Sequence, residues 1–220
     1  MPPLRPTLAI VLCAVVTAVS CLAAGPAQAE SGYRYWGYFH SEAGSSSWTF
    51  ADKGPDDTTP ADGSVEGWRF AITVGTSGRE PRAAADFDAI CGDTALEEGE
   101  KRVAVVIDYG LADEAPDGET PPEPRGECAV VPEQASGTQV LASVADVRVK
   151  SGLTCGIDGY PASECGPEIK DATVPAKDEP VTLQLAGADT ASDFPWEPVG
   201  VGVVVLALAA AAWLTVRRRA

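Results

Sequence analysis

Large and small or polar residues alternate along YRYWGYFH, residues 33–40, and this alternation predicts a β-strand. The turn-like segment EAGSSS follows, and SWTFAD, residues 47–52, is expected to return as a second strand. VEGWRFAITV, residues 65–74, predicts a third strand that is entered through the turn ADGS. KRVAVVIDYG, residues 101–110, is strongly apolar, which is typical of a central strand buried on both faces.

Two helices are predicted between and after these strands. The first covers residues 79–92, where Pro81 suits the first turn and a glycine ends the helix. The second covers roughly residues 138–147 and has Ser136 or Thr138 as its N-cap. This helix would place Val140, Leu141 and Val144 on one face.

LTCGIDGY, residues 153–160, is expected to form a last short strand. The order of elements predicts an α+β fold with a small mixed β-sheet, two helices and two disulfides. We expect this extracellular domain to span residues 30–165. Residues 166–197 are rich in Pro, Gly and Asp and are predicted to form a partly ordered stalk.

The N-terminus has the pattern of a secretory signal peptide. A basic residue is followed by an apolar run and then by Ala-Gln-Ala, which predicts that residues 1–29 are removed by cleavage before Glu30. The alternative is a lipid on Cys21, but the aliphatic residue three positions before it is missing. The signal peptide is therefore the favoured interpretation.

The C-terminus predicts a membrane anchor. Residues 198–216 are apolar and free of charge, a length that suits one transmembrane helix. Residues 217–220 form a basic tail, which the positive-inside rule places in the cytoplasm. A buried core helix is the alternative, and it fits poorly beside three consecutive arginines. We therefore expect a single-pass protein of the cell membrane, with its N-terminal domain outside the cell.

The predicted ectodomain is strongly acidic. All 32 acidic residues but only 12 of the 16 basic ones lie between residues 30 and 197, a net charge of −20. Nucleic-acid binding needs basic surface, so nucleic acid is excluded as a partner. Binding flat on anionic lipid is excluded for the same reason. The expected partners are the membrane, through the C-terminal helix, and a transporter or other membrane protein.

Four cysteines remain after the predicted cleavage, and an even number outside the membrane predicts disulfides. Three pairings are possible, of which we favour Cys91–Cys128 and Cys155–Cys165. The second closes the tight loop CGIDGYPASEC, whose Gly and Pro residues suit turns. Zinc binding is the alternative, but the sequence has no C-x-x-C and no pair of histidines, so no metal site is predicted.

The sequence lacks the usual catalytic patterns. His40 is the only histidine, and it lies within an aromatic strand where an ordinary strand residue is expected. Asp108 ends the buried strand and is expected to cap a turn; a hydrolase would need it beside Asp88 in one cleft. No nucleotide-binding or G-x-S-x-G pattern occurs. We therefore expect neither an enzyme nor a cofactor.

Several segments together resemble a known family. The pattern Y-W-x-Y-F, W-T-F-A and D-G-x-V-x-x-W-R-F is followed by ADFDAICGDT, KRVAVVIDYG, APDGETPP and CGIDGYP. This combination resembles a family of uncharacterised secreted actinobacterial proteins with a C-terminal membrane anchor. The resemblance implies an accessory role beside energy-coupling-factor type uptake systems for vitamins or cobalt.

A second resemblance concerns the C-terminal domain of transcobalamin and intrinsic factor. The aromatic hairpin followed by DGSVEGWRF is similar to the end of that domain, and GTQVLASVADVRVKSGLTCGIDGY is similar to its start. The reversed order implies a circularly permuted, β-grasp-like sheet. It also implies a corrinoid as the ligand class, although the helical partner domain of that family is missing here.

The aromatic run at the start of the mature chain is the candidate binding surface. Tyr35, Trp36, Tyr38 and Trp48 are the predicted ligand-binding residues, since aromatic side chains give large, rigid contact areas. The alternative is that these residues form the core of a thin sheet. The function expected is a non-catalytic, cell-surface ligand-binding or accessory module of a corrinoid or cobalt uptake system. The alternative function is a structural or protein-interaction module without a small ligand.

Overall fold

The computed structural model describes residues 31–175 and 177–185. The predicted signal peptide, Cys21, the predicted transmembrane helix at 198–216 and the basic tail lie outside these residues. Within the described ranges, no helix is long and apolar enough to cross a membrane.

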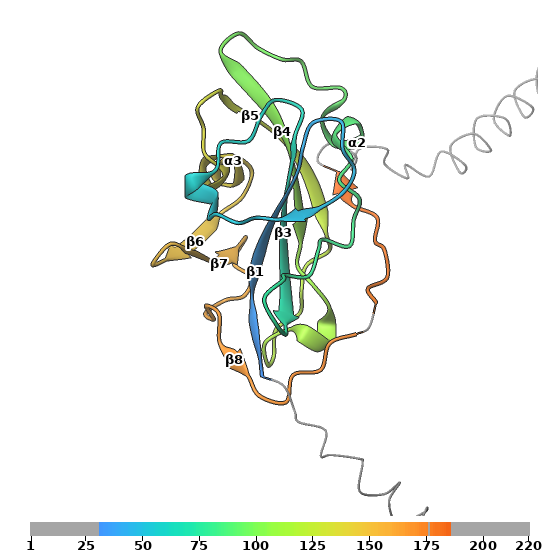
Figure 1. Cartoon of the computed structure of the whole chain (residues 1–220), viewed down its shortest axis with the longest axis vertical. Helices are drawn as coiled ribbons and strands as arrows, with labels where there is room; N and C mark the ends of the chain where they lie inside the picture. Colours follow the sequence, from blue (N-terminus) through green and yellow to red (C-terminus); the bar gives the residue numbers. More distant parts are fainter. Residues whose placement is uncertain (1–30, 176, 186–220) are drawn as a thin grey trace, which may run out of the picture. The chain divides into compact units, whose positions relative to one another are not determined.

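The described residues form an α+β fold around one mixed sheet (Figure 1). The sheet order is β2-β1-β3-β4-β5-β9, and β8 pairs with the start of β1. β3 and β4 are parallel, whereas β1 pairs antiparallel with β2, β3 and β8, and β4 pairs antiparallel with β5. The predicted α+β class with a small mixed sheet is confirmed. The strands are β1 (Gly32–Ser41), β2 (Thr49–Phe50), β3 (Val65–Thr73), β4 (Glu100–Asp108), β5 (Arg125–Pro132), β8 (Glu168–Ile169) and β9 (Gln184–Leu185).

Both faces of the sheet are covered, which explains the apolar sequence of β4. Its residues from Val103 to Ile107 are fully buried, as predicted for a central strand. Figure 1 shows α3 (Gly137–Val144) and the hairpin of β6 (Val147–Lys150) and β7 (Leu153–Ile157) on one side of the sheet. The short helix α2 (Phe87–Cys91) and the C-terminal segment lie on the other side.

Each face has its own hydrophobic core. The first core lies under α3 and the β6–β7 hairpin and is rich in aromatic rings. The second lies under α2 and is built from small residues. The first includes Trp36, Tyr38, Trp68, Phe70, Tyr109, Val140, Leu141 and Tyr160, and the second includes Val65, Ala83, Ala85, Cys91, Ala104 and Val106.

The first helix is much shorter than the predicted range 79–92, and the placement of Pro81 in its first turn was wrong. The helix begins at Phe87, because the Asp86 side chain accepts a hydrogen bond from the Ala89 amide and acts as the N-cap. In the segment before the helix, Arg79 forms an ion pair with Glu114 and Arg82 forms one with Asp108.

The second helix confirms the expected cap at Ser136, which forms a capping box with Gln139. It ends at Val144, because residues 147–150 form β6 and were wrongly included in the predicted helix. The strand β5 was missed altogether. Its buried positions do not alternate regularly, so the short apolar run around Cys128 was the only indication of a strand in the sequence.

Residues after 165 also contact the sheet and the loops around it. β8 pairs with β1, and the compact unit that contains the sheet extends to Gln184. The amides of Val181 and Gln184 donate to the carbonyls of Arg82 and Pro124 at 3.4 and 2.9 Å. The described part of the predicted stalk is therefore attached to the domain. We call residues 177–185 the C-terminal strap.

Both disulfides have the predicted pairing. Cys91–Cys128 joins α2 to β5, and Cys155–Cys165 joins β7 to the segment before β8. The first therefore links the second core to the sheet, and the second closes the loop that supports the β6–β7 hairpin. Two disulfides fit a secreted domain.

Removing the two disulfides separately should have unequal effects on stability. The Cys91–Cys128 bond spans 37 residues and the Cys155–Cys165 bond spans 10. Loop-closure entropy predicts that Cys91→Ala with Cys128→Ala lowers the free energy of unfolding by about 4 kcal/mol, and that Cys155→Ala with Cys165→Ala lowers it by about 3 kcal/mol. Urea denaturation of the oxidised domain measures both. A larger loss from the shorter loop would contradict the expectation.

Candidate functional site

An aromatic pocket of about 260 Å³ lies at the start of β1 and is the first candidate site. Trp36 forms part of its wall and is held in place by a hydrogen bond from its indole Nε1 to the Tyr160 carbonyl at 3.3 Å. Tyr33 and Leu153 also line the pocket and are 53% and 59% exposed. We call this the aromatic pocket; its lining residues are Tyr33, Tyr35, Trp36, Thr73, Gly75, Leu153, Thr154, Cys165 and Gly166.

The structure divides the four predicted aromatic residues between different places. Tyr35 and Trp36 line the aromatic pocket. Tyr38 is buried in the first core, where its ring stacks on Trp68 with the centroids 5.1 Å apart. Trp48 lies against the second core, so the four do not form one flat face.

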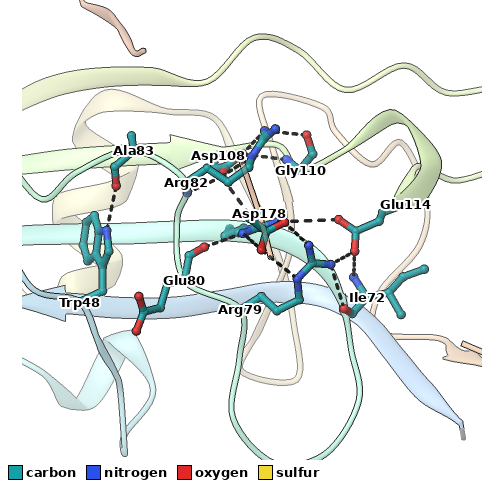
Figure 2. Close-up of polar contacts among 11 residues, drawn as sticks. Trp48, Ile72, Arg79, Glu80, Arg82, Ala83, Asp108, Gly110, Glu114 and Asp178 are labelled. Carbon is teal, nitrogen blue, oxygen red and sulfur yellow. Dashed lines mark hydrogen bonds and ion pairs between the residues drawn. The ribbon is translucent and has the colours of Figure 1, made fainter. Parts of the chain in front are cut away.

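Trp48 is fixed by a close approach to the sheet. Its indole Nε1 donates to the Ala83 carbonyl at 2.9 Å, as Figure 2 shows. A Cβ atom at Gly67 would come within 2.7 Å of the Trp48 ring and 2.9 Å of Pro81. Only glycine at this position lets the ring and Pro81 pack on the strand, which gives Trp48 a structural role.

The sequence had partial signals for the pocket. Tyr33 belongs to the aromatic run but was not among the predicted ligand-binding residues. Leu153 was missed because it comes from β7, far from the hairpin in the sequence. Its exposure at the start of a strand depends on how the β6–β7 hairpin packs beside β1.

A polar pocket of about 330 Å³ lies at the other end of β1 and is the second candidate site. His40 and Glu66 both line it and face each other in the β1–β3 register. The Tyr38 hydroxyl donates to Glu66 and lies 2.8 Å from the Thr58 hydroxyl. His40 Nδ1 is buried and has no hydrogen-bond partner among the described residues.

Glu66 is only 2% exposed, and this burial decides its protonation. Burial raises the pKa of Glu66 from 4.5 to about 7, although the hydrogen bond from Tyr38 and the charge of Lys101 act in the opposite direction. Lys101 is itself buried, and its Nζ donates to the carbonyls of Pro60 and Ala135 at 2.7 Å. Glu66 therefore changes charge near neutral pH, inside a pocket.

A network of ion pairs among three arginines and three carboxylates lies on the opposite face of the sheet, and Figure 2 shows many of its contacts. Arg69 of β3 donates from Nη1 and Nη2 to the two carboxylate oxygens of Asp178, both at 2.8 Å. Arg79 also contacts Asp178 and pairs with Glu114. We call Arg69, Arg79, Arg82, Asp108, Glu114 and Asp178 the arginine–carboxylate network.

Asp108 serves this network rather than a catalytic pair. Its Oδ1 accepts from the Gly110 amide at 3.0 Å, which confirms the expected turn cap. Its Oδ2 accepts from Arg82 Nε at 3.0 Å and from the Arg82 amide at 2.8 Å. Asp88 lies in α2 and lines a different hollow, so the structure does not bring these two carboxylates together in one pocket.

Comparison with known proteins identifies the family. A family model described as the SCO2322-like domain matches residues 28–170, well over half of the chain. The chain belongs to the SCO2322-like domain family. This membership agrees with the predicted actinobacterial family. No curated protein and no solved structure matches the chain.

The SCO2322-like domain contains both disulfides, the aromatic pocket and the polar pocket within its matched range. It also contains every member of the arginine–carboxylate network except Asp178. The link to uptake transporters, the resemblance to transcobalamin and the β-grasp likeness stay predictions. In the described residues, no group of three or more His, Cys, Asp or Glu side chains is arranged to hold a metal ion.

Glu66 gives the stability of the domain a specific pH dependence. Its pKa is higher in the folded state than in the unfolded state, so its contribution is fully present below about pH 4.5 and is lost as the pH rises through about 7. Glu66→Gln removes this ionisation. The stability of the variant relative to the wild type should therefore rise by about 2 kcal/mol between pH 5 and pH 8.

Urea denaturation at both pH values measures this difference. Glu42→Gln is the matched control, because Glu42 lines the same pocket but is exposed. Parallel stability curves for the wild type and Glu66→Gln would show that Glu66 does not ionise in this range.

Proposed function

We propose that this chain is a non-catalytic binding module at the cell surface and that the aromatic pocket is its recognition site. The observation that supports this most directly is the exposure of Tyr33 and Leu153 beside the wall formed by Trp36. Large apolar side chains that remain exposed around a pocket mark binding sites in soluble domains. Both disulfides suit an oxidising location outside the cytoplasm.

The size of the pocket limits how a ligand can bind. At about 260 Å³ it lies below the range of about 300–1,000 Å³ that encloses drug-sized ligands. It has room for the edge of a ring system or for one side chain of a protein. A large ligand would therefore lie across Tyr33 and Leu153 and insert only part of itself.

A corrinoid is the small-molecule class proposed for this site. The resemblance to the transporter-linked family implies an accessory role in corrinoid or cobalt uptake, and a flat macrocycle is suited to an aromatic surface. In this proposal the chain is anchored by residues 198–216 and holds the ligand outside the membrane. A protein partner, such as a transporter, is the second candidate, because exposed apolar side chains around a small pocket also suit one anchoring side chain.

Fluorescence titration of the oxidised ectodomain, residues 30–193, tests the proposal. Cobinamide and cobalamin should quench the tryptophan fluorescence saturably after correction for corrin absorbance, because Trp36 lies in the pocket wall. Replacing Tyr33 and Leu153 together, as Tyr33→Ala with Leu153→Ser, should weaken binding at least tenfold. Leu96→Ser is the matched control, since Leu96 is 52% exposed but does not line the pocket.

Absence of saturable quenching at high micromolar ligand would reject the corrinoid. The protein-partner candidate then makes its own prediction. A membrane protein should co-purify with the full-length chain and should be lost in the Tyr33 and Leu153 double variant, but not in Leu96→Ser. Retention of that partner by the double variant would reject the aromatic pocket as the recognition site.

A further inference from the structure

Asp178 is bound as a peptide ligand's carboxylate would be bound. Arg69 makes two parallel hydrogen bonds to it at 2.8 Å, and Arg79 Nε donates to the same group at 3.3 Å. Such bidentate arginine contacts are geometrically specific for carboxylates. The Arg69 side chain is completely buried, whereas that of Asp178 is 23% exposed. The three arginines are thus more deeply buried than the carboxylate of Asp178, and we call them the arginine cradle.

Charge balance requires an anion in this cradle. Arg69, Arg79 and Arg82 carry three positive charges, and Asp108 and Glu114 supply two negative charges within the same network. Asp178 supplies the third negative charge, without which one positive charge would be uncompensated. A buried charge without a partner is strongly destabilising, so the cradle needs a carboxylate from somewhere.

Apolar contacts continue the interaction along the strap. Val181 and Leu183, three and five residues after Asp178, pack against the second core. Their spacing of two places both on the same side of an extended segment. The strap therefore contributes one carboxylate and two apolar side chains to one surface of the domain.

Main-chain hydrogen bonds complete the binding. Val181 donates its amide to the Arg82 carbonyl, Gln184 donates its amide to the Pro124 carbonyl, and β9 lies at the edge of the sheet beside β5. An extended segment held at a sheet edge by its backbone, with side chains in separate pockets, is a common mode of peptide recognition. The strap shares the backbone hydrogen bonds and the position at the sheet edge, and its apolar side chains pack against the second core.

The occupant and the receptor surface belong to different parts of the sequence. The family match ends at residue 170, so it contains Arg69, Arg79 and Arg82 but not the strap. A hollow of about 450 Å³ lies beside the bound carboxylate and is lined by Arg79, Arg82, Lys177 and Pro180, among others. This gives the cradle an approach from solvent.

We propose that the surface under the C-terminal strap is a peptide-binding groove. Its ligand is an extended segment of a partner protein with an acidic residue followed three and five residues later by apolar residues. In the isolated chain the strap fills the groove and competes with that partner. This surface is separate from the aromatic pocket, so the inference stands independently of the function proposed there.

Peptide binding to the full-length chain tests the groove. The probe is a fluorescein-labelled peptide with the sequence of residues 177–185, KDEPVTLQL, and binding is followed by fluorescence anisotropy. Asp178→Ala in the chain weakens the strap and should tighten peptide binding at least tenfold over the wild type, because the competing segment is bound less often. Replacing the peptide's own aspartate with asparagine should weaken binding to that variant at least tenfold.

Matched variants separate the cradle from general effects of charge. Glu179→Ala removes the neighbouring exposed carboxylate and should bind the labelled peptide with the same affinity as the wild type. Adding Arg79→Ala to Asp178→Ala should abolish the gain in affinity. Asp178→Asn keeps the size of the side chain and should show the same gain, so it replaces Asp178→Ala if that variant does not fold.

Equal affinity of the peptide for the wild type and both Asp178 variants would overturn the proposal. The same conclusion follows if the aspartate and asparagine peptides bind equally well. Concentration-dependent dimers of the wild type in analytical ultracentrifugation, dissociated by excess peptide, would overturn the assignment to a different partner. Such dimers would show that the groove binds the strap of a second copy of this chain.

Discussion

The buried charge of Arg69 constrains more of this domain than any other single group. Its side chain lies within the sheet with no exposed surface, and such a charge is tolerated only when it is compensated and hydrogen-bonded. The compensating carboxylates come from the end of β4, from the short helix η2 (Ala112–Glu114) and from the strap. These segments therefore meet at one point, around Arg69. The network fixes the loop after β4 and the path of residues 79–82, where a helix would otherwise be expected.

The same strand divides two kinds of surface between the two faces of the sheet. Trp68 and Phe70 of β3 point into the aromatic core under α3, whereas Arg69 points to the face covered by α2 and the strap. The first face continues into the polar pocket along β1, and Trp36 of this face also forms part of the wall of the aromatic pocket. The second face provides the arginine cradle and the contacts of the strap. Ligand recognition and strap binding are thus proposed on separate surfaces of one sheet.

Elements with strong local patterns could be predicted, and elements defined by distant contacts could not. The strands β1, β3 and β4 could be predicted from the sequence, because the alternating or continuously apolar pattern of each strand reflects the burial of its side chains on the faces of the sheet. Ser136 was found as a cap because a capping box is a local pattern. The helix expected over residues 79–92 failed because Arg79 and Arg82 bind carboxylates far away in the sequence. The strand β5 was not predicted because its buried and exposed positions do not alternate regularly.

The candidate sites show the same division. The aromatic run indicated that β1 contributes recognition or core residues, but adjacent residues of a strand point to opposite faces, so Trp36 and Tyr35 could not be assigned from composition. Leu153 and Glu66 became candidates only when β7 and β3 were placed beside β1. The composition of the predicted stalk gave no sign that Asp178 would bind arginines in β3 and the following loop.

The sequence by itself determined the α+β class, the central strands, the presence of four cysteines able to form two disulfides and the acidic character of the predicted ectodomain. These properties depend on local periodicity, on short loops and on composition. Only the tertiary structure decided which aromatic side chains are exposed, that Glu66 is buried in a pocket and that the strap belongs to the domain. Each of these depends on contacts between residues distant in the chain, and local propensity has no information about the burial or charge balance that such contacts create.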